Sequence, residues 1–352
     1  MDQLATLLIG FVAAGGIVAV SGVFLTHAGD ELGERLHLGG SWVGLVVLSG
    51  VTSLPELVSS VGGAVWQGQP DLACGNVFGS NCFNVTIIAL LDLYYQGVAL
   101  SFQFGVLPTF SAGLGIVMTA LGAIAILSNQ RTLFPSPPFG ELTWSLLIVF
   151  GYLACMFLIF RFERKSLREA KGSKPEEEPV EATIIGESTW KPLLWRLGVS
   201  SLVVVAGGLS MVFLADELAE FEFSFGKLGH TFVGTIGLAL ATSLPELVVG
   251  VTALRMGKFE LAIGNVFGSN IFNILVLAIC QFAYAPFYAE SFYGGISETN
   301  LLSAFLAVLL AGVAIAGLMY HGRKTFLGLG WDTGTILILF TAGMYLLFRL
   351  GH

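Results

Sequence analysis

The sequence contains few charged residues. Asp, Glu, Lys and Arg make up only 11% of its 352 residues, whereas hydrophobic residues make up 55% and the mean hydropathy is +0.82. Soluble domains carry roughly 25% charged residues, so this chain has too little charge to cover a water-facing surface. The shortage excludes an ordinary soluble protein and predicts an all-α integral membrane protein that lies in a lipid bilayer.

Residues that would indicate other functions are also scarce. The four cysteines, Cys74, Cys82, Cys155 and Cys280, have no spacing typical of a metal site, and we expect them to be small packing residues. There is no basic patch of the kind that binds nucleic acid. We find no nucleophile–base pair and no cofactor motif, so we expect neither an enzyme nor a bound cofactor. The sequence does not indicate an oligomeric state.

Long hydrophobic runs fill most of the chain. A membrane-spanning helix needs roughly 20 apolar residues, and charge clusters and turn residues divide the sequence into ten such segments. The predicted spans are 3–27, 40–66, 71–94, 104–128, 141–161, 191–216, 230–255, 259–286, 299–320 and 332–350.

One long polar stretch separates these spans into two sets of five. It contains a basic block, an acidic block and scattered Pro and Gly, which together indicate an exposed linker. The predicted domains are therefore a first five-helix repeat at 1–161, a linker at 162–190 and a second five-helix repeat at 191–352.

Lys and Arg are distributed unevenly between the two sides of the predicted membrane. If the N-terminus lies outside, 13 of the 16 basic residues fall in inner loops and flanks, and only Arg131, Lys227 and Arg349 fall outside. The positive-inside rule favours this orientation. We predict a multi-pass protein of the cell membrane with both termini outside and the 162–190 linker in the cytoplasm.

Two polar motifs occur twice. GNVFGSNCFN at 75–84 and GNVFGSNIFN at 264–273 agree at nine of ten positions, and VTSLPELVSSV at 51–61 matches ATSLPELVVGV at 241–251. Because each half contains an odd number of spans, the second copy must insert with the opposite orientation. Two inverted-topology repeats with interrupted helices at matching positions are typical of a secondary transporter whose site lies near the midplane of the membrane.

Glu56 and Glu246 are the charged residues that lie deep inside predicted spans. A carboxylate at this depth costs several kcal/mol and marks a functional site by default. Thr52 and Thr242 lie four residues earlier, on the same helix faces. Each Glu follows a proline, which removes a backbone donor, so we expect both helices to loosen there.

The decapeptides carry a polar residue at every fourth position. Such a stripe can form interhelical hydrogen bonds or supply ligands. Together with the hydroxyls and carboxylates of the TSLPEL motifs, these groups would form an all-oxygen site, which suits a hard cation such as Ca²⁺. No His or Cys joins this set of residues, which disfavours Zn or Cu. The stripe residues are Asn76, Ser80, Asn84, Asn265, Ser269 and Asn273.

Paired glycines accompany the stripe in both copies. Gly75 and Gly79, like Gly264 and Gly268, are four residues apart. This small-xxx-small spacing predicts close approach of a neighbouring helix.

The duplicated TSLPEL and GNVFGSNxFN motifs resemble the alpha repeats of the sodium/calcium exchanger family, within the cation/calcium antiporter superfamily. The resemblance covers nearly the whole chain, and the short linker is similar to that of compact prokaryotic-type members. It implies exchange of Ca²⁺ for Na⁺ by alternating access, with the first and sixth helices sliding against the other eight. The ion ligands that it implies are the side chains of Thr52, Ser53, Glu56, Ser80, Asn84, Thr242, Ser243, Glu246, Ser269 and Asn273 and the backbone carbonyls of Ser49 and Ala239.

The chain departs from the family pattern at Asn273, where family members commonly carry Asp. Two carboxylates remain, with a maximum formal charge of −2 from Glu56 and Glu246. The counter-ion and the coupling ratio therefore stay open. A proton/calcium exchanger is the alternative within the same class, and a cation channel with a glutamate-lined filter is a less favoured alternative, because channels usually assemble charge rings by oligomerising.

Overall fold

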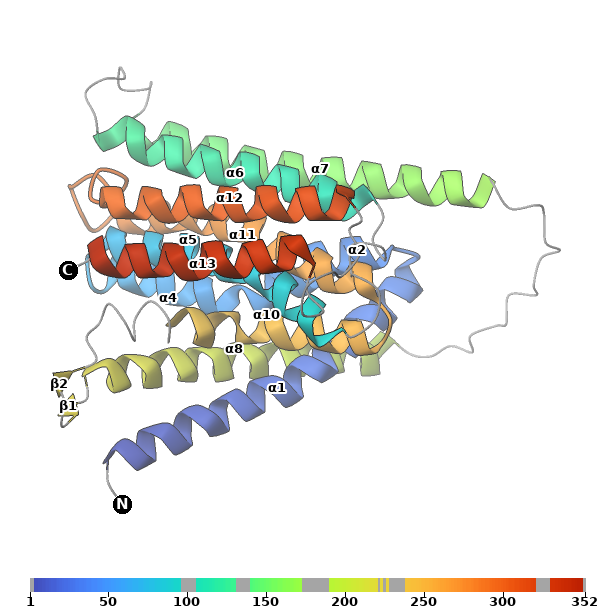
Figure 1. The fold of residues 1–352 in the computed structure, drawn as a ribbon, viewed down its shortest axis with the longest axis horizontal. Helices are drawn as coiled ribbons and strands as arrows, with labels where there is room; N and C mark the ends of the chain where they lie inside the picture. Colours follow the sequence, from blue (N-terminus) through green and yellow to red (C-terminus); the bar gives the residue numbers. More distant parts are fainter. Residues whose placement is uncertain are drawn as a thin grey trace.

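The computed structural model describes residues 3–95, 106–130, 140–172, 190–220, 222–223, 226–227, 238–320 and 330–350 (Figure 1). The helices are α1 (Gln3–Leu36), α2 (Gly40–Trp42), the π-helical turn η1 (Val43–Leu48), α3 (Ser49–Thr52), α4 (Leu54–Val65), α5 (Pro70–Tyr94), α6 (Val106–Gln130), α7 (Glu141–Gly172), α8 (Trp190–Glu220), α10 (Leu238–Arg255), α11 (Phe259–Tyr284), α12 (Glu298–Tyr320) and α13 (Trp331–Leu350).

The predicted all-α membrane fold is confirmed. Within the described ranges, eight helices are long and apolar enough to cross a membrane, and nine are if the bent segment from Gly40 to Val65 counts as one span. Helix α10 is the described part of the span predicted at 230–255, whose first residues lie outside the described ranges. Strands β1 (Glu222–Phe223) and β2 (Gly226–Lys227) form a short antiparallel hairpin after α8.

Two helices extend further than the spans predicted for them. Helix α1 continues to Leu36 and α7 continues to Gly172, so the beginning of the segment predicted as a linker is helical. Hydropathy marks only the part of a helix that lies in lipid, whereas these extensions are polar and carry ion pairs one turn apart, such as Arg35 with Glu31 at 2.5 Å. Pairs of this spacing support a helix in water. The rest of the predicted linker, residues 173–189, lies outside the described residues.

The two halves of the chain run in opposite directions through the bundle. Helix α1 begins at the end of the bundle where α13 finishes, whereas α7 ends and α8 begins at the opposite end (Figure 1). Each half therefore crosses the bundle an odd number of times, as the inverted-repeat prediction requires.

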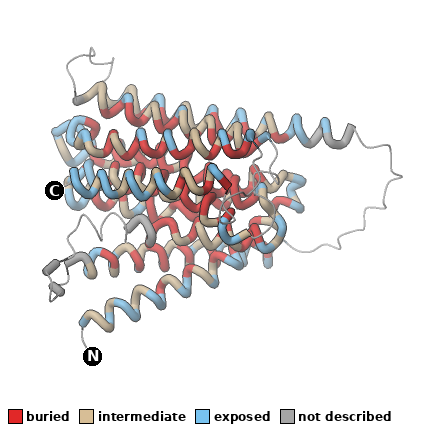
Figure 2. The backbone as a smooth tube through the Cα atoms, in the orientation of Figure 1, coloured by how far each residue is buried: buried red, intermediate tan, exposed pale blue. Residues whose placement is uncertain are grey.

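The centre and the periphery of the bundle differ in burial. Helices α5 and α11 contact each other at the centre, and both also contact α4 and α10, whereas α1 packs along α8 at one edge. Figure 2 shows that buried residues concentrate in the central helices. The outer helices expose large apolar side chains, including Val12, Leu202 and Ile338, as expected where lipid rather than water covers the surface.

An ion-pair cluster joins the end of α1 to the turn between α10 and α11. Lys258 Nζ lies 3.0 Å from Asp30 Oδ1 and 3.1 Å from Glu34 Oε1. The hydrogen bond that Lys258 donates to Asp30 raises the pKa of the ammonium group. Arg196 of α8 pairs with Glu31 in the same region.

Candidate functional site

The first TSLPEL motif lies where its helix breaks. The segment from Gly40 to Thr52 and helix α4 are bent by 41° relative to each other, and Ser53 between them has φ −87° and ψ 8°. Pro55 has no N–H and crowds the carbonyl four residues earlier, which explains the break. The prediction is wrong for the second repeat, because α10 stays helical through Pro245 over its described length. A membrane helix tolerates an internal proline where neighbouring groups satisfy the freed carbonyl.

The two buried carboxylates are each contacted by a serine from the other repeat. Glu56 and Glu246 both have 0% exposure. Ser53 Oγ donates to Glu246 Oε1 at 3.1 Å, and Ser243 Oγ donates to Glu56 Oε1 at 3.5 Å. Because Ser53 and Ser243 occupy equivalent positions in the two motifs, the contacts are reciprocal. Each repeat therefore completes the surroundings of the other repeat's carboxylate.

Helices α5 and α11 bring further hydroxyls to the same place. Ser269 Oγ donates to Glu246 Oε1 at 3.2 Å, and the hydroxyls of Ser80 and Thr242 lie 3.4 Å apart. Thr52 Oγ1, which is also buried, donates to Asn265 Oδ1 at 3.3 Å. The fold thus gathers side chains of both motifs and of both repeats in one buried cluster.

The two predicted backbone ligands lie one turn before the serines of the cluster. The Ser49 carbonyl accepts from Ser53 N at 3.0 Å and lies 3.3 Å from Thr52 Oγ1, as an alternative to Asn265 Oδ1 for the single hydrogen of that hydroxyl. The Ser49 hydroxyl donates to the Leu45 carbonyl within η1. Ala239 lies in the first described turn of α10, four residues before Ser243. The Ser49 carbonyl is thus next to two residues of the cluster, and the sequence spacing puts Ala239 at the equivalent position in the second repeat.

Several buried oxygens of this cluster accept no hydrogen bond from the described residues. They are Glu56 Oε2, Glu246 Oε2, Asn84 Oδ1 and Asn273 Oδ1. An unsatisfied buried polar atom costs about 1–3 kcal/mol, and more if it is charged, so such atoms are rare unless they have a function. Buried acceptors without donors are suited to a cation. No group of three or more His, Cys, Asp or Glu that could hold a metal occurs among the described residues.

The sequence did not single out two asparagines that lie next to the cluster. Asn81 Nδ2 donates to the Asn270 carbonyl at 3.2 Å, and Asn270 Nδ2 donates to the Asn81 carbonyl at 3.4 Å. These residues are equivalent in the two decapeptides, so their mutual bonds lie at the pseudo-two-fold axis. They fall outside the four-residue polar stripe and were missed for that reason. Their identity in both copies was the available signal.

Asn76 forms interhelical hydrogen bonds, which is the other interpretation of the polar stripe. Its Nδ2 lies 2.8 Å from Ser60 Oγ and 2.9 Å from Ser59 Oγ, both on α4. The equivalent positions of α10 are Val249 and Gly250, which offer no such acceptors. These bonds therefore join α5 to α4 in the first repeat, and the equivalent positions of the second repeat cannot form them.

The glycine pairs also behave differently in the two repeats. A Cβ added at Gly264 would lie 2.5 Å from the Ser41 carbonyl oxygen, and one at Gly268 would lie 2.6 Å from Ser49 Oγ. A Cβ at Gly79 would meet nothing within 4 Å. The predicted close approach therefore occurs at both glycines of the second repeat. In the first repeat a Cβ at Gly75 would lie 3.2 Å from Asn300 Oδ1, and the prediction is wrong for Gly79.

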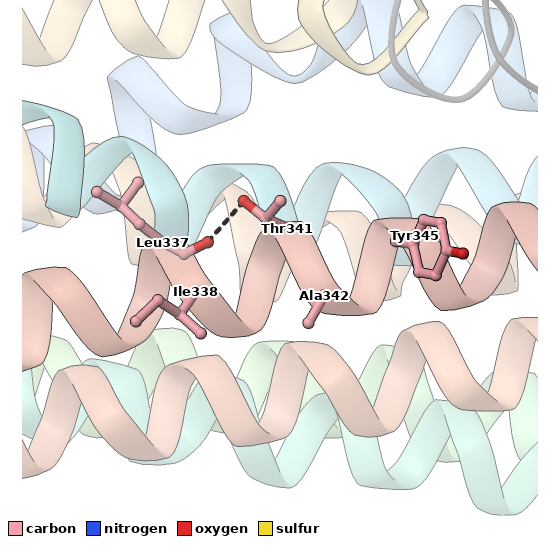
Figure 3. Close-up of a pocket in the computed structure, with 5 residues that line it drawn as sticks. All are labelled: Leu337, Ile338, Thr341, Ala342 and Tyr345. Carbon is pink, nitrogen blue, oxygen red and sulfur yellow. Dashed lines mark hydrogen bonds between the residues drawn. The ribbon is translucent and has the colours of Figure 1, made fainter.

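A shallow pocket on α13 does not belong to this cluster. Figure 3 shows its five lining residues along one helix. Ile338 and Tyr345 are 70% and 66% exposed, and the Thr341 hydroxyl donates to the Leu337 carbonyl at 2.8 Å. The pocket therefore presents hydrocarbon to its surroundings, as expected of a lipid-facing helix.

The fold and the buried cluster together define a class of protein. Two sets of membrane spans run in opposite directions, and the cluster between them is buried, polar and contains two carboxylates. This combination is that of an inverted-repeat secondary transporter.

The family follows from sequence. A model of the family described as sodium/calcium exchanger protein matches residues 6–162 and 193–351. The chain belongs to the sodium/calcium exchanger protein family. It is a multi-pass membrane antiporter of the cation/calcium class and not an enzyme, so the channel alternative is not supported.

Individual relatives agree with this assignment. CaxA of Alkalimonas amylolytica, named as a candidate antiporter, is 25% identical over 329 residues, which cover 92% of each chain. The sodium/calcium exchanger MaX1 of Methanosarcina acetivorans is 26% identical over 334 residues, which cover 90% of this chain and 91% of MaX1. A solved structure of the sodium-calcium exchanger NCX_Mj superposes with a TM-score of 0.69 over 98% of this chain and 99% of that one, at 16% identity. This likeness shows the shared fold.

Proposed function

We propose that the protein exchanges Ca²⁺ for Na⁺ at the cluster around Glu56 and Glu246. One observation carries the proposal: each buried carboxylate receives a serine hydroxyl from the opposite repeat on one oxygen and leaves its second oxygen without a donor. Ca²⁺ takes six to eight oxygen ligands, including carboxylates, carbonyls and amides. The cluster supplies all of these types, and its two carboxylates balance one Ca²⁺ or two Na⁺.

The proposed ligands are the residues implied by the family motifs. The assignment is supported by the contacts that Ser53 and Ser269 make with Glu246 and by the contact between Ser243 and Glu56, because these contacts join the two repeats. The full set is Ser49, Thr52, Ser53, Glu56, Ser80, Asn84, Ala239, Thr242, Ser243, Glu246, Ser269 and Asn273.

Alternating access is the mechanism that we propose, because a site with two fully buried carboxylates has to open to each side in turn. Helices α1 and α8 pack against α10 and α4, which carry the two glutamates, and glycines lie at these contacts. A Cβ at Gly22 would lie 2.7 Å from Val248, and one at Gly208 would lie 2.7 Å from Pro55. Glycine contacts of this kind let each helix lie close against the site helices, which suits two helices that slide over the rest of the bundle. As these two helices slide, the repeats at 1–161 and 191–352 would exchange conformations.

A proton/calcium exchanger is the second candidate. Its support is that the cluster contains two buried carboxylates, either of which could release Ca²⁺ when it is protonated. Ca²⁺ uptake into proteoliposomes, with Na⁺ and H⁺ gradients imposed separately, distinguishes the two. We expect uptake to follow the Na⁺ gradient and to persist when the pH gradient is collapsed. Uptake that follows only the pH gradient would assign the counter-ion as H⁺.

The site assignment is tested by Glu56→Gln and Glu246→Gln. Each replacement keeps the shape of the side chain and removes the charge that a divalent cation requires. We expect each variant to lose Ca²⁺ transport at matched protein levels. Glu163→Gln is the control, because Glu163 is also buried but lies on α7, where it accepts from Trp42 N at 3.2 Å. Wild-type transport by either site variant would contradict the assignment.

A further inference from the structure

The hydrogen bonding around Asn84 and Asn273 is unequal, although the two residues are equivalent in the repeats. Asn273 Nδ2 donates to Asn81 Oδ1 at 3.0 Å. The matching bond would run from Asn84 Nδ2 to Asn270 Oδ1. Among the described residues, neither of these two atoms has a hydrogen-bond partner. All four side chains are at least 95% buried, so exposure to solvent does not explain the difference.

The direction of these bonds follows from the backbone. The Asn270 carbonyl can only accept, so the NH₂ group of Asn81 must face it. The Oδ1 of Asn81 then faces Asn273. Because this oxygen can only accept, Asn273 must donate to it from its own NH₂ group. The Oδ1 of Asn273 is left facing away from Asn81, with no donor. Asn81 therefore determines which atom of Asn273 is available to an ion.

We propose that Asn81 and Asn270 are positioning residues that hold Asn273 and Asn84 in turn, one in each access state. The inference rests on the proposed function. Alternating access moves one part of an inverted-repeat transporter against the other. Because the two repeats carry the same motifs in opposite orientation, we expect the opposite-facing state to have the same hydrogen bonding with the repeats exchanged. The exchange moves the hydrogen bond from the Asn81–Asn273 pair to the Asn270–Asn84 pair. In each access state, the amide oxygen of one of the two residues Asn273 and Asn84 is thus held in place, and that of the other is released.

The same geometry accounts for the amide at position 273. Asn81 offers an acceptor there, and an Asn side chain can donate to it at 3.0 Å. An ionised Asp at this position would bring two acceptor oxygens together, and Asn81 could reverse its amide only by losing its bond to the Asn270 carbonyl. Asn273 and Asn81 are thus complementary as a pair.

The test compares Asn81→Ala with Asn270→Ala. The variants are matched in that each removes one of the two reciprocal bonds to the carbonyls of Asn270 and Asn81. In the structure described, Asn81→Ala also removes the bond from Asn273. The apparent KM for Ca²⁺ is measured at each membrane face separately, in right-side-out and inside-out vesicles. Loss of one hydrogen bond corresponds to about a three- to tenfold change. We expect each variant to raise KM by that factor at one face, and the two variants to act at opposite faces.

A double-mutant cycle distinguishes a positioning role of Asn81 from a purely structural role. If Asn81 acts through Asn273, then Asn81→Ala changes KM no further in an Asn273→Ala background, whereas Asn270→Ala still does. Asn81→Ser serves as a second variant if Asn81→Ala does not assemble, because serine is too short to reach both partners but can bond to its own helix.

Equal effects of both variants at both faces, or unchanged KM values in both, would overturn the inference. Additive effects of Asn81→Ala and Asn273→Ala would also overturn it. These failures leave the proposed function intact as long as Glu56→Gln is inactive. A fully active Glu56→Gln would instead remove the proposed function itself.

Discussion

At the scale of single residues, the chemistry of the cluster depends on its limited charge. Glu56 and Glu246 are its two carboxylates, and Asn273 contributes an amide oxygen that has no donor. Serines from the opposite repeats occupy one oxygen of each carboxylate. The net charge of a loaded site is therefore determined by two side chains.

The first residue-scale prediction concerns voltage. Two carboxylates balance one Ca²⁺ or two Na⁺, so we expect weakly voltage-dependent exchange in the wild type. Asn273→Asp adds a carboxylate that can hold a further Na⁺, and moving one more charge across 100 mV is worth about 2.3 kcal/mol. The variant should show a steeper dependence of Na⁺-driven Ca²⁺ flux on clamped membrane potential.

The control for this measurement is Asn84→Asp, which adds the same charge at the equivalent position of the first repeat. In the described structure Asn84 has no hydrogen-bond partner to lose. The charge argument is wrong if wild-type flux is already steeply voltage-dependent and Asn273→Asp leaves that dependence unchanged.

At the scale of elements, identical motifs pack against different neighbours. Helix α11 lies against η1 and α3 so closely that a Cβ at Gly268 would overlap the Leu45 carbonyl oxygen as well as Ser49 Oγ. The equivalent residue on α5 is Gly79, which has open space around it. Backbone cannot move aside as a side-chain end can, so the two glycines differ in how far they tolerate a methyl group.

We therefore expect Gly268→Ala to be destabilising and Gly79→Ala to be tolerated. Overpacking of a close contact costs about 1–3 kcal/mol, whereas alanine in an open helix position gains up to about 1 kcal/mol over glycine. Thermal unfolding in detergent should show a lowered midpoint for Gly268→Ala and an unchanged or raised one for Gly79→Ala. Equal midpoints would show that α11 relaxes away from η1.

At the scale of the whole molecule, the orientation in the membrane remains a prediction. It rests on the 13 of 16 Lys and Arg residues that fall on one side. A cysteine placed at 170–185 should react with an impermeant reagent only from the cytoplasm, because the positive-inside rule places this segment there.

The background for this labelling is favourable, because the four native cysteines are buried. Cysteines introduced near either terminus should react from outside. Labelling of the 170–185 segment from outside would reverse the proposed topology.

The sequence by itself determined the general architecture. Its hydrophobic runs located the membrane spans, its duplicated motifs indicated the inverted repeats, and the depth of Glu56 and Glu246 singled out the carboxylates. These properties are local, since hydropathy and helical periodicity depend on neighbours within a few turns. The hydropathy of α1 and α7 predicted their ends too early, because the polar extensions are stabilised by ion pairs rather than by lipid.

Only the tertiary structure decided how the two copies differ. The crosswise serine contacts, the reciprocal bonds of Asn81 and Asn270, and the break at Ser53 without a matching break at Pro245 all depend on partners far away in the chain. Nearly identical motifs cannot predict unequal surroundings. A single conformation of two inverted repeats places them unequally because the packing around each copy comes from different helices, and that packing determines which polar atoms are paired.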